Sequence, residues 1–367
     1  MWANNGCSAP KYPPERFGPD PLQRSIMGSA SVDVPHVASN ERLRSRNTFT
    51  VDAARIRDYA RAVGNDDSIH LDAGAAAARG FGALVAPPTF ATMVWMRAEE
   101  ETLAALVPGF HIGRILHADR TLDILRPLLA GDRVGCDVHF ESFRHYRDYD
   151  IVSMTTTLRD QPGQIVTVGS STLLVHTQRL SARGAGPIGY ERGLELVPAR
   201  HRPRTAGPGD HLPIRHRGVA VTRSPQPVID FTGLRVGSEL PVRRHALASA
   251  DVMHHASVVG RPGGLVADDR APAPPPVAAT PGMLSLGLAA GYLSSWLGDP
   301  TAVTKYRVQY APKMHYLPVG TAEPTPVEFR GRVTWLNPVR RTATVVIEAT
   351  AKGRKLFGYA TAEARFA

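Results

Sequence analysis

Residues 51–82 read VDAARIRDYARAVGNDDSIHLDAGAAAARGFG, and this stretch decides the fold of the first half of the chain. Four of its residues recur at helical spacing and fall on one face: Ile56, Tyr59, Ala60 and Val63. Gly64 follows where helices commonly end, because glycine adopts a positive φ at little cost. A polar segment and an alanine-rich run come next, so the sequence predicts a helix, a polar connection and a second short helix that ends near Gly80.

The residues that follow predict one long helix and then a sheet. Pro87 and Pro88 suit the entry and first turn of a helix, and the apolar run after them suits a helix that is buried nearly all round. From about Ile115 onward, apolar and polar residues alternate between turn signals, which is typical of strands. The predicted fold class is α+β, with the long helix lying across an antiparallel sheet.

The second half of the chain repeats this order of elements. Gly64 and Gly260 end corresponding helices 196 residues apart, and Pro88 and Pro281 precede corresponding apolar runs 193 residues apart. Further along, the dipeptides Arg126-Pro127 and Ala311-Pro312 are 185 residues apart. Three features in the same order at nearly equal spacing indicate a duplication. The alternative is two unrelated α+β domains that share a common order of elements.

With 367 residues, the chain is long enough for two domains that each bury a core. We expect four segments: a disordered tail at 1–40, a first unit at 41–180, a basic linker rich in proline and glycine at 181–222, and a second unit at 223–367. No run of 18 or more apolar residues is present, so we expect no membrane span. We see no secretory signal, and two distant cysteines fit a reducing, cytoplasmic location.

The net charge of +10 is concentrated in the linker rather than on a domain face. Nine arginines and three acids lie between Arg179 and Arg223, among several prolines. A solvated linker explains this composition, so we expect no nucleic-acid partner, and nucleic-acid binding stays the weaker alternative. A phosphate-rich ligand, such as the adenosine end of coenzyme A, is a third option for these arginines.

The segment from Tyr59 to His70 carries the pattern on which a functional interpretation depends. It resembles the signature of the MaoC-like family of (R)-specific enoyl-thioester hydratases and dehydratases, which runs Tyr, a few residues, Gly-Asp-x-Asn-Pro-x-His and an alanine-rich helix. The resemblance continues through Ala-Pro-Pro-Thr-Phe at 86–90 and Arg-Pro-x-x-Ala-Gly-Asp at 126–132. This half is most similar to the N-terminal, fatty-acid-synthase-like dehydratase branch of the family.

The second half resembles a further MaoC-like copy through Pro-Gly-Met-Leu at 281–284 and Trp-Leu-Gly-Asp-Pro at 296–300. Together the two resemblances cover most of residues 45–367. They imply a double hotdog fold, in which each of two tandem units wraps its sheet around a long central helix. The two sheets of such a fold are continuous.

The family resemblance assigns candidate catalytic roles by position. His70 takes the place of the family histidine and Asn65 that of the family aspartate, and in the family these two residues hold the attacking water. Asp67 stands where the motif has asparagine. An amide orients water but cannot accept a proton from it, so Asp66 or Asp67 would have to help, for example by orienting His70. The ordinary alternative is a solvated histidine beside turn-forming aspartates.

The start of each central helix is the candidate substrate-binding site, because in the family a backbone N–H there holds the thioester oxygen. Helix-start N–H groups lack partners within the helix, and the helix dipole adds to the effect. In the first unit Pro88 occupies the family's glycine position and has no N–H, so Thr89 or Phe90 would supply one. In the second unit Gly282 keeps the family's glycine.

The resemblance implies (R)-specific hydration of an enoyl-CoA, or dehydration of a 3-hydroxyacyl thioester, as part of lipid metabolism. The first unit would act on an acyl-CoA or acyl carrier protein thioester, because Arg261 and Val266 replace the acid–base pair in the second unit. We expect a lyase without cofactor or metal, working as a homodimer or as a monomeric pseudo-dimer. The alternative is a catalytically impaired hotdog protein that binds acyl thioesters or partners an active hotdog subunit.

Overall fold

The computed structural model describes these stretches of the chain: 42–45, 48–106, 115–146, 149–176, 194–196, 224–260, 278–279, 282–310, 318–319 and 323–367. The first unit contains β1 (Arg42–Ser45), β2 (Phe49–Thr50), α2 (Ala53–Ala62), α3 (Ser68–Leu71), α4 (Ala73–Ala78), α5 (Ala91–Leu106), β3 (Ile115–Ile124), β4 (Arg133–Tyr146), β5 (Tyr149–Asp160) and β6 (Ile165–His176), followed by β7 (Leu194–Leu196). The second unit contains β8 (Glu239–Leu247), α6 (Ser249–Val258), β9 (Ala278–Ala279), α7 (Gly282–Leu297), β10 (Val303–Tyr310), β11 (Pro318–Val319), β12 (Thr325–Asn337), β13 (Thr342–Ala351), β14 (Arg354–Lys355) and β15 (Phe357–Arg365).

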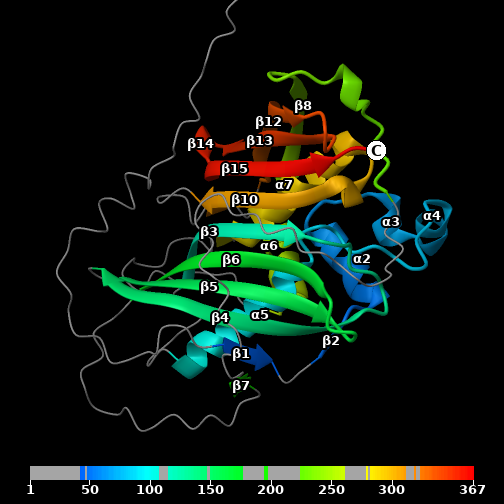
Figure 1. The fold of residues 1–367 in the computed structure, drawn as a ribbon. Helices are drawn as coiled ribbons and strands as arrows, with labels where there is room; N and C mark the ends of the chain where they lie inside the picture. Colours follow the sequence, from blue (N-terminus) through cyan, green and yellow to red (C-terminus); the bar gives the residue numbers. More distant parts are fainter. Residues whose placement is uncertain are drawn as a thin grey trace, which may run out of the picture.

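One continuous antiparallel sheet runs through both units (Figure 1). Its strand order is β7-β1-β4-β5-β6-β3-β10-β15-β13-β12-β8. Outward from the middle, β3, β6, β5 and β4 of the first unit correspond to β10, β15, β13 and β12 of the second. This mirrored order confirms the α+β class and the double hotdog fold, and a pseudo-twofold axis passes between β3 and β10.

The two halves of the sheet are joined where β3 and β10 pair. The pairing is antiparallel and extends from Asp123 opposite Lys305 to Asp119 opposite Gln309. An ion pair of 2.8 Å between Lys305 Nζ and an Asp123 carboxylate oxygen also crosses the seam. Backbone hydrogen bonds and a side-chain ion pair both span the seam. We therefore infer that the two units form one continuous domain rather than two independent domains joined by a linker.

Each unit has one central helix, α5 in the first and α7 in the second, and both lie on the same face of the sheet (Figure 1). Ten of the sixteen residues of α5 are buried, as are thirteen of the sixteen residues of α7. The prediction of a helix buried nearly all round is confirmed for α7, whereas α5 is buried on one side and has exposed residues such as Arg97 and Ala104 on the other.

The end of α2 lies directly against the central helix of the other unit. A Cβ on Gly287 would sit 2.5 Å from Val63 Cγ1, and a Cβ on Gly291 would sit 3.0 Å from the Gly64 carbonyl oxygen. Only glycine permits so close an approach. Gly64 itself has a φ of +59° and ends α2 as predicted. The polar segment that follows Gly64 therefore begins at the interface between the two units.

Two features differ from the prediction. The polar connection after Gly64 contains the short helix α3, and residues 194–196 of the predicted linker form β7, which pairs with β1 at the edge of the sheet. The remainder of the predicted linker, the predicted tail at 1–40, and Arg261 and Val266 lie outside the described residues.

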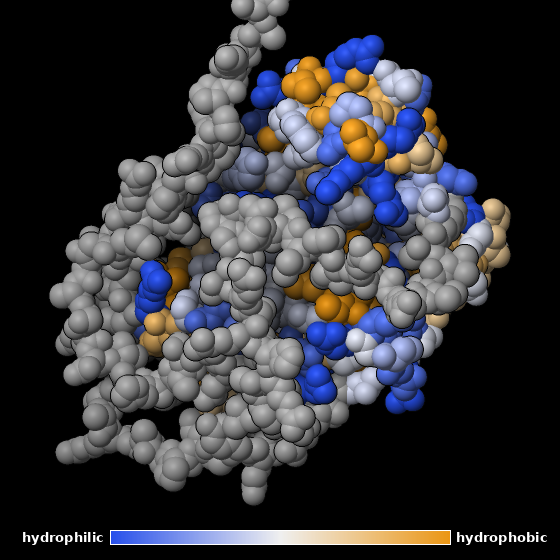
Figure 2. Space-filling view, in the orientation of Figure 1, coloured by the Kyte–Doolittle hydropathy of each residue, from blue (hydrophilic) through white to orange (hydrophobic). Residues whose placement is uncertain are grey.

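Among the described helices, none is long and apolar enough to cross a membrane. Figure 2 shows hydrophilic and hydrophobic residues interspersed over the part of the second unit that faces the viewer. A cytoplasmic location and the pairing of two chains remain predictions.

Candidate active site

The short helix α3 carries His70 and owes its position to two local features. Gly64 turns the chain out of α2, and the Asn65 N–H then donates to the Ala60 carbonyl at 2.9 Å. The Asp67 carboxylate accepts the Ile69 N–H at 3.1 Å and so caps the start of α3. Asn65 is 2% exposed and His70 is 0% exposed, so the solvated histidine of the ordinary alternative is not what the structure shows.

The Val85 carbonyl fixes the tautomer of His70. His70 Nδ1 lies 2.6 Å from that oxygen, and a carbonyl can only accept, so Nδ1 carries the proton and donates it to Val85. The neutral ring then presents a lone pair on Nε2, which is buried and has no hydrogen-bond partner among the described residues. His70 therefore has the tautomer of a base, with an unpartnered Nε2.

The surroundings of His70 favour the neutral form of the ring. Burial lowers the pKa of His70 below its ordinary value of 6.5, although the Val85 carbonyl and the Asp67 carboxylate work in the opposite direction. The positive charge of Arg79 lowers the pKa further. The ring is consequently uncharged at neutral pH, which is the state a proton acceptor needs.

Asn65 and Asp67 take different parts in this segment. Asn65 Nδ2, a donor, is buried without a partner in the described part of the chain, as the reactive nitrogen of His70 is. The Asp67 carboxylate is already engaged, because one oxygen caps α3 and the other accepts from Arg79 Nη1 at 3.2 Å. Asp67 therefore suits the orienting role and not that of a free proton acceptor. Asp66 is 77% exposed on its side chain and pairs with Arg243 at 3.9 Å.

The turn that precedes α5 contains a backbone donor without a backbone acceptor among the described residues. The Phe90 N–H donates to the Pro87 carbonyl at 2.9 Å, whereas the Thr89 N–H has no acceptor within the described residues. Of the two donors expected at this position, Thr89 is thus the one available. The Phe90 ring is buried in the core, with its centroid 5.4 Å from that of Tyr59 in an edge-on arrangement.

Tyr59 holds this turn in place, a role that the sequence pattern alone did not reveal. Its hydroxyl donates to the Thr89 carbonyl at 3.0 Å and lies 3.2 Å from Thr89 Oγ1. Thr92 Oγ1 donates to the same carbonyl at 2.7 Å. The family tyrosine therefore positions the start of the central helix in this chain.

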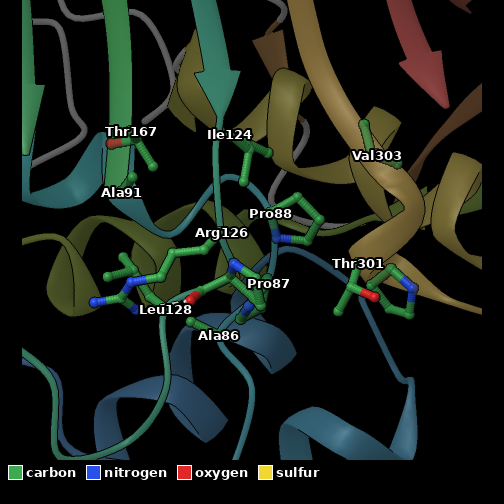
Figure 3. A pocket seen from close by; sticks show the side chains of 12 residues that line it. Ala86, Pro87, Pro88, Ala91, Ile124, Arg126, Leu128, Thr167, Thr301 and Val303 are labelled. Atoms are coloured by element: carbon green, nitrogen blue, oxygen red, sulfur yellow. Dashed lines mark hydrogen bonds between the residues drawn. The ribbon is translucent and has the colours of Figure 1, made fainter. Parts of the chain in front are cut away.

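A small pocket of about 20 Å³ adjoins the start of α5 and has room for about one water molecule. Figure 3 shows Pro87 and Pro88 in its wall, with Ile124 and Arg126 of the first unit on one side and Thr301 of the second unit on the other. The pocket therefore lies where the two units meet, next to the turn that carries Thr89. Its lining does not include Asn65 or His70.

The second unit keeps the helix start but not an open site. Gly282 begins α7, and a Cβ there would sit 2.8 Å from the ring of Tyr310. The tyrosine ring thus covers the position at which the resemblance placed a substrate contact. The two residues that replace the acid–base pair in this unit, Arg261 and Val266, are outside the described residues.

His255 of α6 is the residue that corresponds to Tyr59 across the pseudo-twofold axis. The two ring centroids are 6.4 Å apart, and His255 is 1% exposed with neither ring nitrogen partnered among the described residues. Burial, and secondarily the neighbouring His254, lowers the pKa of His255 from 6.5 to about 4. The folded protein therefore resists protonation of this ring.

This lowered pKa predicts acid-dependent loss of stability. Between pH 6.5 and 4 the unfolded chain binds a proton at His255 that the folded chain does not, so the free energy of unfolding falls as the pH is lowered. The expected contribution is on the order of 3 kcal/mol, present above pH 6.5 and lost by about pH 4. Urea unfolding at several pH values should give a much shallower pH dependence for His255→Leu, whereas the exposed His254→Gln, which removes only the secondary effect, should keep most of it. An equally steep dependence in His255→Leu would contradict this prediction.

A buried ion pair in the first unit was not predicted from the sequence. Arg120 Nη2 donates to Glu99 Oε2 at 2.8 Å, and Ser171 Oγ donates to Glu99 Oε1 at 2.7 Å. Arg120 is 1% exposed and Glu99 is 2% exposed. The guanidinium also lies over the Trp95 ring at 5.8 Å. The pair anchors β3 to α5 inside the core.

Two tandem units, each with a long central helix on one face of a shared antiparallel sheet, define a double hotdog protein. A family model described as the FAS1-like dehydratase domain region matches residues 41–168. A UPF0336 protein of Streptomyces griseus is 31% identical over 126 residues, which are 34% of this chain and 84% of that protein. A UPF0336 protein of Mycobacterium leprae is 30% identical over 125 residues, or 34% of this chain and 79% of the relative.

Solved structures match over both units. A protein described as a MaoC-like dehydratase is 29% identical with a TM-score of 0.74, covering 90% of this chain and 98% of that one. A conserved hypothetical protein of Mycobacterium tuberculosis, described as a double hotdog fold, matches with a TM-score of 0.57 at 14% identity, covering 90% of this chain and 98% of that one, and so shares the fold. The chain belongs to the MaoC-like dehydratase family, with a FAS1-like dehydratase region in its first unit.

Proposed function

We propose that the first unit catalyses the (R)-specific hydration of an enoyl thioester, or the reverse dehydration of a 3-hydroxyacyl thioester, with His70 as the proton carrier. The observation that carries this proposal is the unpartnered Nε2 of His70, a neutral base whose other nitrogen is committed to Val85. The Thr89 N–H at the start of α5 supports it, since an unpaired N–H at a helix start is the kind of donor that stabilises a thioester oxygen.

The reaction needs one proton to move twice. His70 Nε2 accepts a proton from water while the water oxygen bonds to Cβ of the enoyl group, and the electron pair of the double bond shifts toward the thioester oxygen. The Thr89 N–H and the N-terminal dipole of α5 stabilise the negative charge that develops there. The enolate then re-forms its carbonyl as Cα takes the proton back from His70. One water is added, and the ring returns to its starting state.

Asn65 suits a role in orienting the water. Its Nδ2 donates, and the lone pair on His70 Nε2 accepts, so a water molecule held between them would receive one hydrogen bond and give one. This arrangement leaves all proton transfer to His70, because an amide does not take up a proton. It explains how the site would function without the family aspartate.

The proposal is tested by incubating the purified chain with trans-enoyl thioesters of several chain lengths, each on coenzyme A and on acyl carrier protein. We expect hydration to the (3R)-hydroxyacyl product, measured by loss of the enoyl absorbance and by chiral analysis. Comparison of the two carriers and of the chain lengths identifies the substrate. Absence of turnover with every thioester, or formation of the (3S) product, would contradict the proposal.

A change at Asn65 should raise the activity. In Asn65→Asp the new carboxylate can accept the proton of water, so we expect kcat to increase by about tenfold or more. Asn65→Ala, which removes the donor to the water, should lower kcat instead. Steady-state kinetics of both variants check the prediction, and equal kcat values in the two would show that residue 65 does not contact the reacting water.

A second candidate function is the binding of acyl thioesters without turnover. Two residues favour it: Asn65 stands in place of the family aspartate, and Pro88 has no N–H at the position of the family glycine. Acyl-CoA binding measured by calorimetry, together with no turnover by the wild-type chain and no gain in Asn65→Asp, would support this second candidate over the first.

A further inference from the structure

Arg79 bonds to both units of the chain through a single atom. This residue follows α4, and its Nη1 donates to Asp67 Oδ2 at 3.2 Å and to the Gly298 carbonyl at 3.1 Å. Gly298 ends the central helix α7 of the second unit with a φ of +68°. The carbonyl at the end of a helix lacks a partner within the helix and carries the negative end of its dipole, so an arginine is well suited to it.

The same contacts lead to the base of the first unit. Asp67 uses its second oxygen to cap α3, the four-residue helix that contains His70. A series of hydrogen bonds therefore runs from Gly298 through Arg79 and Asp67 to the Ile69 N–H of α3. The N–H of the next residue, His70, donates to the Asp67 backbone carbonyl at 3.0 Å. The side chain of Asp67 is 12% exposed and that of Arg79 is 34% exposed, so the pair is partly shielded from water.

We propose that Arg79 is a positioning residue through which the second unit sets both the placement and the proton affinity of His70. This inference rests on the proposed function and deepens it, because it gives the second unit a part in the catalysis of the first. In the second unit, Tyr310 covers the start of α7. The end of the same helix still contributes to the first unit, because the Gly298 carbonyl accepts a hydrogen bond from Arg79.

The charges around His70 make this role measurable. The Asp67 carboxylate raises the pKa of His70 and the Arg79 guanidinium lowers it, in addition to the effect of burial. From α2, Arg57 donates to the Leu71 carbonyl at the end of α3. From β8, Arg243 faces Asp66 and His245 lies against Gly64. The Val85 carbonyl accepts the hydrogen bond from His70 Nδ1.

The test uses the full chain with Arg79→Met and Asp67→Asn, because each substitution removes one charge at nearly constant size. Asparagine can still cap α3 through its side-chain oxygen. The imidazole resonance of His70 is followed by NMR as a function of pH, and kcat and KM are measured for the enoyl thioester. Arg61→Met, an exposed arginine of α2 that pairs with Asp58, is the matched control.

We expect the pKa of His70 to rise in Arg79→Met and to fall in Asp67→Asn, with no change in Arg61→Met. In Arg79→Met kcat should fall by about tenfold while KM changes little, because a small displacement of the base is costly. Arg79→Lys, which keeps the charge, should restore the pKa and only part of kcat. If Arg79→Met and Asp67→Asn shift the pKa in the same direction, or leave it unchanged, Arg79 has a structural role alone and the inference is wrong.

The NMR titration needs no turnover, so the inference and the proposed function fail separately. A protein with opposite pKa shifts in the two variants but no hydration of any thioester would retain the coupling and lose the activity. A protein that hydrates enoyl thioesters but shows no such shifts would retain the activity and lose the coupling.

Discussion

Replacing His70 with glutamine is expected to lower kcat for enoyl thioester hydration by about 10²- to 10⁴-fold, the range that general acid–base catalysis contributes. Glutamine is similar in size and can donate to the Val85 carbonyl, so the segment around α3 should keep its structure. What is lost is the lone pair at Nε2, which in the proposed mechanism takes the proton from water and returns it to Cα. KM should change little, because that mechanism assigns the thioester oxygen to Thr89 and not to residue 70.

The matched control is His254→Gln, since this histidine is exposed on α6 and close in sequence to the buried His255. Its kcat should equal that of the wild-type chain. Steady-state rates and a thermal unfolding curve for both variants separate a catalytic loss from a folding defect. If His70→Gln folds normally and keeps more than half of the wild-type kcat, His70 is not the proton carrier.

Replacing Arg120 with methionine is expected to lower the free energy of unfolding by about 3 to 5 kcal/mol, as is usual when one partner of a buried ion pair is removed. Burial by itself raises the pKa of Glu99, but the charge of Arg120 and the Ser171 hydroxyl outweigh burial and hold the pKa below its ordinary value. Without Arg120 the carboxylate is left in the core with no compensating charge. It must then be protonated or reached by water, and both cost stability.

The double variant Arg120→Met and Glu99→Met should recover most of this loss, because an apolar pair of similar volume replaces two buried charges. Two guanidinium nitrogens of Arg120, Nε and Nη1, have no partner among the described residues, which makes the native pair less favourable than its short contact suggests. Urea unfolding of both single variants and the double variant gives the coupling energy. A double variant whose loss equals the sum of the two single losses would show that the charges do not interact.

The elements that local pattern determines could be predicted from the sequence. The helical spacing of Ile56 and Tyr59 predicted α2, and both residues are buried. Gly64 and Gly260 were expected to end corresponding helices, and both have a positive φ. The helix and its end depend on residues close together in the chain, so their signal lies within one window of sequence. The continuity of the two sheets was expected only from the family resemblance, and the structure has one continuous sheet.

The parts of the site that depend on distant contacts could not be predicted. The close approach of α2 to Gly287 and Gly291 joins segments of the two units that lie far apart in the chain. The partner of Arg79 at Gly298 is 219 residues away in sequence. α5 contains three consecutive glutamates at 99–101, and nothing in this run indicates that Glu99 will be buried and pair with Arg120 on a strand. Tertiary packing, rather than local composition, decides these contacts.

The account is tested most directly by comparing two pH dependences of the wild-type chain: kcat/KM for enoyl thioester hydration, and the NMR titration of His70. A base must be unprotonated to accept the proton of water, so kcat/KM should fall as the pH drops through the pKa of His70. Since burial lowers that pKa, the account predicts that the two midpoints coincide and lie below 6.5. An acid limb that lies at a different pH from the His70 titration, or that persists unchanged in His70→Gln, would contradict the assignment of His70 as the catalytic base.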